Sequence, residues 1–85
     1  ILTKALFRKT NLQNANFTSS DLTSAIFTEA KLTGSNFNSA IIRNARFDNA
    51  ILDNADLTNV DLDSAFLNNA SMKEIITSKQ NSTTK

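Results

Sequence analysis

The 85-residue chain contains no cysteine, proline, histidine, tryptophan or tyrosine, and it has a single glycine. Without cysteine it has neither a disulfide framework nor a thiolate metal site, which leaves the redox compartment open. No apolar run approaches the roughly 18 to 20 residues of a membrane span, and no charged-then-apolar leader is present. The sequence therefore predicts a soluble protein of one domain, without a compartment that can be named.

The lack of proline and near-lack of glycine would be unusual for a loop-rich domain, so the turns must be made by other residues. What the chain does contain is a five-residue repeat, seen most plainly at 45–49, 50–54 and 55–59. Each unit reads small, variable, large apolar, polar, polar. An uninterrupted repeat of this kind is the signature of a solenoid.

The large apolar residue of each unit, here called the centre residue, recurs at every fifth position. Two positions before it the residue is small in every unit except at Val60. We expect the centre residues to form the core; they are Leu2, Phe7, Leu12, Phe17, Leu22, Phe27, Leu32, Phe37, Ile42, Phe47, Leu52, Leu57, Leu62, Leu67 and Met72.

A period of five fits neither an α-helix, which turns about 100° per residue, nor a continuous strand, whose side chains alternate between faces. The chain must therefore turn within every unit. The small and centre residues are two apart, which is strand spacing, so both can point inward. The two polar positions that follow are rich in Thr, Asp, Asn and Ser, which form local turns, and they must carry a corner. The pattern predicts an all-β solenoid of short strands and corners.

The number of units in one coil follows from the alternation of Leu and Phe among the centre residues. Three-sided coils would stack Leu2 on Phe17, whereas four-sided coils stack Phe7 on Phe27 on Phe47. Like residues in one column suit a ladder with about 4.8 Å between equivalent residues, because aromatic rings can then stack in register. The sequence predicts a four-sided coil, repeated about 3.6 times in a rod roughly 17 Å high.

Units 15–19 (Ala-Asn-Phe-Thr-Ser) and 55–59 (Ala-Asp-Leu-Thr-Asn) resemble the signature of the pentapeptide-repeat family, commonly written A(D/N)LXX. The resemblance covers residues 1–74, over which some fifteen consecutive units keep the frame. It implies the family's right-handed quadrilateral β-helix with short parallel strands for this segment. The chain begins in mid-pattern at Ile1 without an initiator Met, which predicts a further segment upstream.

The chain departs from this signature at inward and outward positions. Thr10, Ser20 and Ser35 replace the inward Ala, where a hydroxyl must find a nearby carbonyl to avoid a cost of about 1 to 3 kcal/mol. The residue before the centre, usually Asp or Asn in the family, is apolar in six units. These residues are Ile1, Leu6, Ile26, Ile41, Ile51 and Phe66.

In a four-sided coil Leu6, Ile26, Arg46 and Phe66 form one outward column. Singly exposed apolar residues are normal, and branched or aromatic residues suit a β-surface, so ordinary surface is the simpler interpretation. A column of three along the whole rod favours an interaction site, because contiguous exposed apolar area tends to mark one. We expect this face to contact another protein or a second copy of the chain, with Arg46 as a polar anchor.

The net charge of +1 conceals a basic first part, with Lys4, Arg8 and Lys9, and a run of later aspartates. The aspartates are Asp48, Asp53, Asp56, Asp61 and Asp63. We interpret the charges as a solvated surface that discourages edge-to-edge stacking of coils. A nucleic-acid site would need more basic residues with stacking aromatics, so nucleic acid is not favoured as a partner.

Residues 71–85 break the pattern as read from the sequence. Ser71 and Glu74 match a capping box, and Met72, Ile75 and Ile76 then fall on one helical face. This predicts a short helix over 72–79 that caps the last coil, followed by a disordered tail over 80–85. The alternative is that Met72 closes the last strand and the rest frays.

No pattern in the sequence indicates catalysis, a cofactor or a metal. Acid–base chemistry would rest on carboxylates and lysine, and these lie at outward positions on a convex rod. Asp61 and Asp63 are spaced like calcium ligands, but the glycine and the later bidentate Glu of a calcium loop are missing. We expect no enzyme activity and no small-molecule substrate.

Two function classes remain. The first is a rigid interaction or spacer module that presents flat faces to another protein or to itself. The second comes from the family resemblance, since pentapeptide proteins of the quinolone-resistance type imitate duplex DNA in shape and charge and protect DNA gyrase. That imitation needs a long, strongly acidic surface. A net charge of +1, with the acids confined to one part of the rod, favours the first class.

Overall fold

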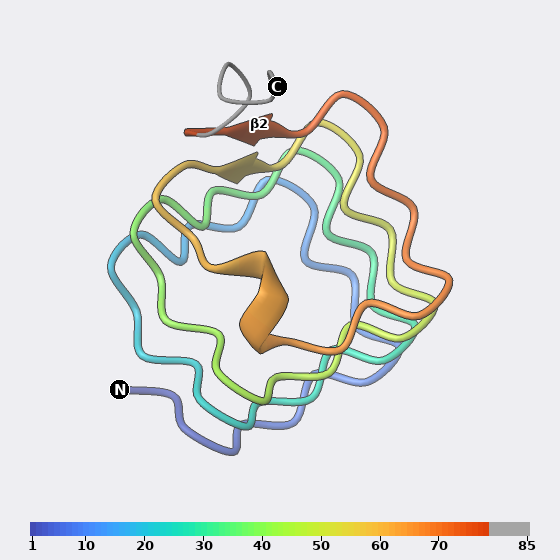
Figure 1. Ribbon diagram of the computed structural model, residues 1–85. Coiled ribbons are helices and arrows are strands. Elements are labelled where there is room, and N and C mark those ends of the chain that lie inside the picture. The colour runs from blue at the N-terminus through green and yellow to red at the C-terminus, as the bar shows by residue number, and fades with distance from the viewer. Residues whose placement is uncertain (79–85) are drawn as a thin grey trace.

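The computed structural model describes residues 1–78 and winds them into stacked coils around one axis (Figure 1). Its regular elements are short: strand β1 (Asp56–Leu57), the 3₁₀ helix η1 (Leu62–Ser64) and strand β2 (Ile76–Thr77). Strands β1 and β2 pair in parallel, with Asp56 opposite Ile76. The tail predicted for 80–85 lies outside the described residues.

Parallel pairing joins residues that are twenty apart, as a four-sided coil requires. At this period the described residues make just under four coils: coil 1 (1–20), coil 2 (21–40), coil 3 (41–60) and coil 4 (61–78). In Figure 1 the chain runs counterclockwise as it advances from the N-terminus toward the viewer, so the coil is right-handed.

Each of the four faces is named here by its outward column, the residues that precede the centres. Face 1 carries Ile1, Asp21, Ile41 and Asp61; face 2 carries Leu6, Ile26, Arg46 and Phe66; face 3 carries Asn11, Lys31, Ile51 and Ser71; face 4 carries Asn16, Asn36, Asp56 and Ile76.

The ladder between coils 2 and 3 on face 1 shows how one coil binds the next. The N–H of the centre residue Leu22 donates to the carbonyl of Ile41 (2.7 Å), and the N–H of Ile41 donates back to Ser20 (2.9 Å). At the corner, the N–H of Ser24 donates to the carbonyl of Arg43 (2.8 Å). Because these bonds recur along the rod, they hold the faces flat and fix which residues share a column.

The corners depend on left-handed backbone. The last residue of the unit has a positive φ in fourteen of fifteen units, between 56° and 64° at thirteen non-glycine residues and 71° at Gly34. Lys4 and Glu29 adopt it as readily as Asn and Ser, although left-handed backbone costs such residues about 1 kcal/mol. A Cβ at Gly34 would meet only the side-chain oxygen of Asn14, the end of an exposed and flexible side chain that can move aside, so glycine is not required there.

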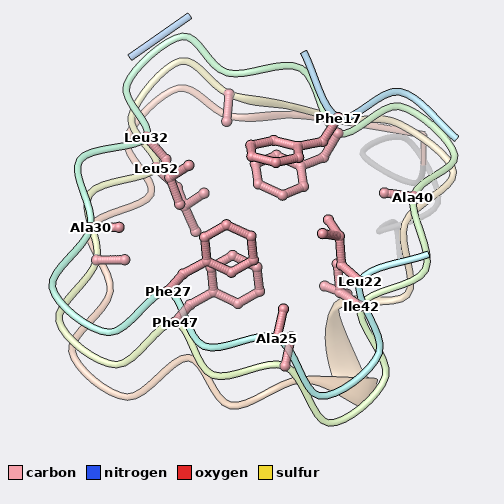
Figure 2. Packing of buried hydrophobic residues seen from close by; sticks show 14 of the residues in the cluster. Phe17, Leu22, Ala25, Phe27, Ala30, Leu32, Ala40, Ile42, Phe47 and Leu52 are labelled. Atoms are coloured by element: carbon pink, nitrogen blue, oxygen red, sulfur yellow. The ribbon is translucent and has the colours of Figure 1, made fainter. Parts of the chain in front are cut away.

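The centre residues fill the interior in columns (Figure 2). Phe27 stacks between Phe7 and Phe47, with ring centroids 4.9 and 4.8 Å away, and Phe17 stacks on Phe37 at 5.0 Å. Nine centre residues are buried: Phe17, Leu22, Phe27, Leu32, Phe37, Ile42, Phe47, Leu52 and Leu57. The other six belong to the end coils, where nothing in the described chain covers one side, and they are partly or more exposed.

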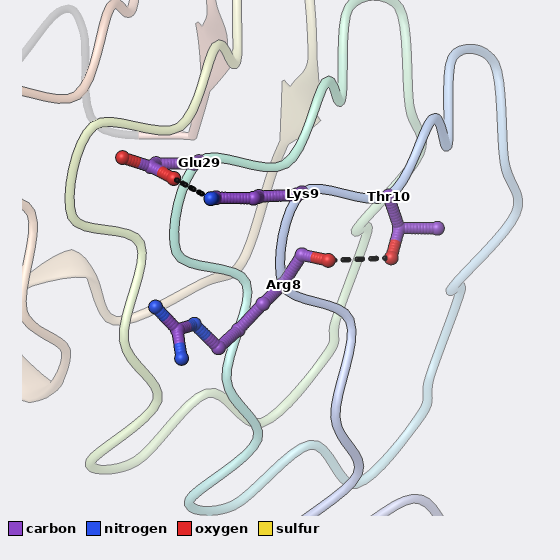
Figure 3. A network of polar contacts seen from close by, with 4 residues as sticks. All are labelled: Arg8, Lys9, Thr10 and Glu29. Atoms are coloured by element: carbon purple, nitrogen blue, oxygen red, sulfur yellow. Dashed lines mark hydrogen bonds and ion pairs between the residues drawn. The ribbon is translucent and has the colours of Figure 1, made fainter.

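The inward-facing hydroxyl groups differ in their hydrogen bonding. The hydroxyl of Thr10 donates to the carbonyl of Arg8 at 3.2 Å (Figure 3). The hydroxyl of Ser35 is buried and has no partner among the described residues, so the expectation of a nearby carbonyl is wrong there. The backbone N–H of Ser35 is bonded, to the carbonyl of Leu32 (3.0 Å), so the hydroxyl alone is left without a partner.

The helix predicted over 72–79 is wrong for the described part, because residues 75–77 form one more unit of the β-helix. Ile76 pairs with Asp56, Ile75 packs against the core, and Glu74 has a φ of 58°, which no α-helix admits. The Ser71 hydroxyl donates to Asp53 Oδ1 (2.6 Å) rather than capping a helix. The β-helix predicted for 1–74 therefore continues to Thr77.

Face 1 of coil 4 is the irregular part of the described chain. Here η1 replaces the strand, and Figure 1 shows it lying inward of the coils behind it. Asp61 caps η1 by accepting the Asp63 N–H at Oδ1 (3.1 Å), and Ser64 is the one corner residue without a positive φ. The fourth coil thus closes partly over the end of the rod instead of extending face 1.

Candidate protein-contact face

The structure brings together the four residues expected to form a contact face. Successive parallel pairs join Leu6 to Ile26, Ile26 to Arg46, and Arg46 to Phe66, so face 2 keeps its ladder through all four coils. Leu6 is 74% exposed and Phe66 44%, whereas Ile26 between them is half-buried. The apolar column is therefore most accessible at its two ends.

Arg46 is held in place at the middle of this column. Its guanidinium carbon lies 4.7 Å from the centroid of the Phe66 ring, and its Nη2 atom is 2.7 Å from Asp48 Oδ2. A guanidinium on an aromatic face gains roughly 0.5 to 1 kcal/mol at an exposed site. Because Arg46 is fixed by two partners, a protein that bound it would spend less entropy in ordering it.

Other exposed apolar residues lie away from face 2. Ile1 and Ile41 are exposed on face 1, and Ile51 on face 3, as their places before the centre residues indicated. Ile76 on face 4 is exposed as well, and it was missed because the sequence assigned it to a helix. Face 2 differs from these faces in carrying large apolar side chains in three of four coils.

The carboxylates with a resolved pKa shift are stronger acids than usual. The Thr23 hydroxyl and N–H both bond to Asp21 Oδ1, and they hold the pKa of this carboxyl below its ordinary value of 3.8. The Ser71 hydroxyl and the Lys73 N–H do the same to the pKa of Asp53. A general base poised near neutral pH would need the opposite shift, so neither group is prepared for proton transfer.

The basic residues of coil 1 do not form a continuous patch. Lys9 Nζ lies 3.7 Å from Glu29 Oε1 in the next coil (Figure 3). Both side chains are largely exposed, so this ion pair contributes little to stability. It does place an acid beside one of the three basic residues, which reduces the positive field that a nucleic acid would meet.

Neither a metal site nor a membrane span is found within residues 1–78. Their side chains form no cluster of three or more His, Cys, Asp or Glu residues of the kind that holds an ion. Their one helix, η1, falls far short of the length and hydrophobicity that crossing a bilayer demands.

Comparison with known proteins identifies the repeat. The family model described as "Pentapeptide repeat region" matches residues 1–76, nearly all of the chain. The chain belongs to the pentapeptide-repeat family. Membership supports a non-catalytic repeat protein with the family's right-handed β-helix, in agreement with the coil in Figure 1.

Among solved structures, a pentapeptide repeat protein (Rfr23) from the cyanobacterium Cyanothece 51142 is 29% identical to this pentapeptide-repeat chain, with a TM-score of 0.44. The match covers 85% of this chain and 59% of that one, so the chain spans less than two thirds of its length. No curated protein gave a significant match.

Proposed function

We propose that this pentapeptide-repeat protein is a non-catalytic, rigid module that binds another protein through face 2. The observation that carries the proposal is the unbroken column of Leu6, Ile26, Arg46 and Phe66, held in register by three successive ladder pairs. A preformed column does not have to be ordered on binding, which lowers the entropic cost of association.

The chemistry of face 2 defines the surface it would fit. Leu6 and Phe66 offer apolar contacts at either end, and Arg46 offers a cation whose side chain is already fixed. Aromatic and arginine side chains are the types that most often supply binding energy at protein interfaces. A complementary partner would present an apolar ridge with a carbonyl or carboxylate facing Arg46.

The gyrase-protecting function of DNA-mimicking relatives is not favoured by the charges. Acidic residues occur near every face rather than along one of them: Asp21 and Asp61 on face 1, Asp48 beside face 2, Asp53 beside face 3, and Asp56 on face 4. Asp48 is moreover neutralised by Arg46. A supercoiling assay with gyrase and a fluoroquinolone tests this alternative, and we expect no protection.

The proposal is tested with the double variant Ile26→Asp and Phe66→Asp. Both side chains point outward, so the variant should keep the circular dichroism spectrum and cooperative melting of the parent. Binding to a partner identified by pull-down and then purified should weaken by about tenfold or more, since the variant replaces two apolar contacts with charged groups that the interface would have to desolvate.

The matched control is Asn11→Asp with Ile51→Asp on face 3, which places the same charges two coils apart on either side of Lys31, as the test charges lie on either side of Arg46. It should bind like the parent. Equal binding by the folded face 2 variant and the control would contradict the proposal and move the search to the N-terminal end around Lys4, Phe7 and Arg8.

A further inference from the structure

Within residues 1–78, face 1 is the one face on which ladder bonds between coils 3 and 4 are missing, although the corner bond persists from the Asn44 N–H to the carbonyl of Ser64 (2.8 Å). On the other faces, Phe66 donates its N–H to Ala45, Ser71 to Ala50, and Ile76 to Ala55, each at 2.9 Å. The equivalent bonds on face 1 would join the Asp61 N–H to the carbonyl of Ala40, and the Ile42 N–H to the carbonyl of Asp61. Neither bond forms, because η1 has drawn this segment inward.

Residues 40–42 therefore have one edge that is paired with coil 2 and one edge that is open toward coil 4. On the paired edge, the Ile41 N–H donates to the carbonyl of Ser20 (2.9 Å), and the Leu22 N–H donates to the carbonyl of Ile41 (2.7 Å). On the open edge, the N–H of Ile42 and the carbonyl of Ala40 have no hydrogen-bond partner among residues 1–78. Ile42 is 1% exposed and Ala40 5%. Each backbone group left unpaired in such surroundings costs roughly 1 to 3 kcal/mol.

The open edge faces a cavity of about 220 Å³. It is lined by residues 39–43, by Asn59 near the end of coil 3, and by Asp61 and Ser64 of coil 4. A water molecule occupies about 30 Å³ in the liquid, so the space is large enough for a short length of backbone. The gap thus combines an unpaired donor, an unpaired acceptor and room for a ligand that satisfies both.

We propose that this gap is a strand-addition site, which binds an extended segment of another polypeptide parallel to residues 40–42. One residue of that segment takes the place that Asp61 would hold in a regular coil. Its N–H donates to the carbonyl of Ala40, and its carbonyl accepts the N–H of Ile42, as in every regular rung of this ladder. This site is separate from face 2 and does not depend on the contact proposed there.

The donor and acceptor together define the class of ligand. A carboxylate would satisfy the Ile42 N–H but repel the Ala40 carbonyl, and an ammonium group would do the reverse. A secondary amide offers both partners at once. The bound residue directs its own side chain outward, so that side chain is free, whereas its two neighbours point inward against η1 and must be small.

The test uses the amide of Ile42, with that of Leu22, its regular equivalent in coil 2, as an internal control. The probe is the N-acetylated hexapeptide amide Thr-Ala-Ser-Ala-Thr-Ser, titrated into the ¹⁵N-labelled full chain. We expect a saturable shift of the Ile42 amide with a Kd on the order of 1 mM, slower hydrogen exchange at Ile42, and no change at Leu22. The same peptide with an N-methyl group on its first serine lacks the donor to Ala40 and should not bind.

Val60→Ala supplies the second measurement. Val60 holds the small position of the irregular unit, and the substitution removes two methyl groups next to η1, so it tests whether η1 can rejoin the ladder. If Val60→Ala protects the Ile42 amide from hydrogen exchange as well as the Leu22 amide is protected, the variant should no longer bind the peptide. Protection at Ile42 and peptide binding should therefore change in opposite directions. The proposal is overturned if Ile42 matches Leu22 in the parent without peptide, as in a gap filled by fixed water, or if the N-methyl peptide binds equally.

Discussion

Units Ala55–Asn59 and Val60–Ser64 are consecutive in the chain, and both place Asp before Leu, yet only the first lies in the ladder. In that unit Asp56 Oδ1 accepts both the N–H of Thr58 (3.0 Å) and its hydroxyl (2.6 Å). Ala55, the small residue of this unit, is fully buried, and Asn59 has the left-handed φ of 62° that a corner needs. Each position of the unit thus supports the same geometry.

The second unit differs first at its small position. Val60 stands in the column above Ala40 and is only partly buried, whereas Ala40 is buried. The Ser64 N–H and hydroxyl then bond to the carbonyl of Asp61 at 3.2 and 2.7 Å, which closes the 3₁₀ turn. The comparison teaches that the loss of the left-handed corner at Ser64, more than the size of the small residue, marks the unit that leaves the ladder, since Ile75 is larger than Val60 and its unit still pairs with coil 3.

The largest loss of stability should come from a core substitution in the regular coils. Phe27→Ala removes the ring stacked between Phe7 and Phe47 and should lower the free energy of unfolding by about 3 to 5 kcal/mol. Leu62→Ala, the centre residue of the irregular unit, should cost no more than about 2 kcal/mol because Leu62 is only partly buried. Denaturant unfolding measures both. Equal costs would contradict the division into regular and irregular parts.

A smaller effect of opposite sign, an increase in stability, is expected from a substitution in the regular coils. Ser35→Ala restores alanine in a buried position and removes a hydroxyl without a partner, so it should raise the stability by about 1 kcal/mol. Ser20→Ala is the matched control, since Ser20 holds the same small position but is only partly buried. Its effect should stay within about 0.5 kcal/mol. A loss of stability in Ser35→Ala would show that the hydroxyl is satisfied.

The smallest effect concerns the side-chain bond that holds coil 4 to coil 3 at face 3. Asp53 Oδ1 accepts the Ser71 hydroxyl and the Lys73 N–H, which lowers the pKa of Asp53 in the folded protein. A carboxyl with a lowered pKa stabilises the fold above its unfolded pKa of about 3.9, and this contribution is lost as the pH falls through the folded value.

We therefore expect hydrogen exchange at Lys73 to speed up below about pH 4, relative to Leu22 in the regular half. Asp53→Asn keeps an acceptor oxygen but cannot titrate, so it should show a weaker dependence on pH. The same acid response in the parent and in Asp53→Asn would contradict this role of the carboxylate.

Much of the fold could be predicted because the period of five places each side chain in or out. The five-residue frame predicted that Phe27 and Phe47 share one inward column, and the four-sided coil predicted that Ile26 and Arg46 share one outward face. The left-handed backbone at Glu29 could not be foreseen, since the ladder imposes it against the preference of the side chain.

The errors lie where a local signal competed with the ladder. The capping box at Ser71 and Glu74 favoured a helix, but pairing of β2 with β1 outweighs it and carries the repeat through Thr77. Val60 was visible as the one exception among the small residues. Its unit leaves the ladder whereas the unit of the larger Ile75 stays in it, so the size of the small residue alone could not predict the break.

The central claim is that one coil takes twenty residues, and disulfide formation tests it most directly because the chain has no cysteine of its own. Lys31 and Ile51 pair across face 3, so Lys31→Cys with Ile51→Cys should form a disulfide under mild oxidation at the ladder spacing of about 4.8 Å. Lys31→Cys with Arg46→Cys, fifteen residues apart on different faces, should remain reduced. Rapid cross-linking of the second pair and not the first would contradict the four-sided coil.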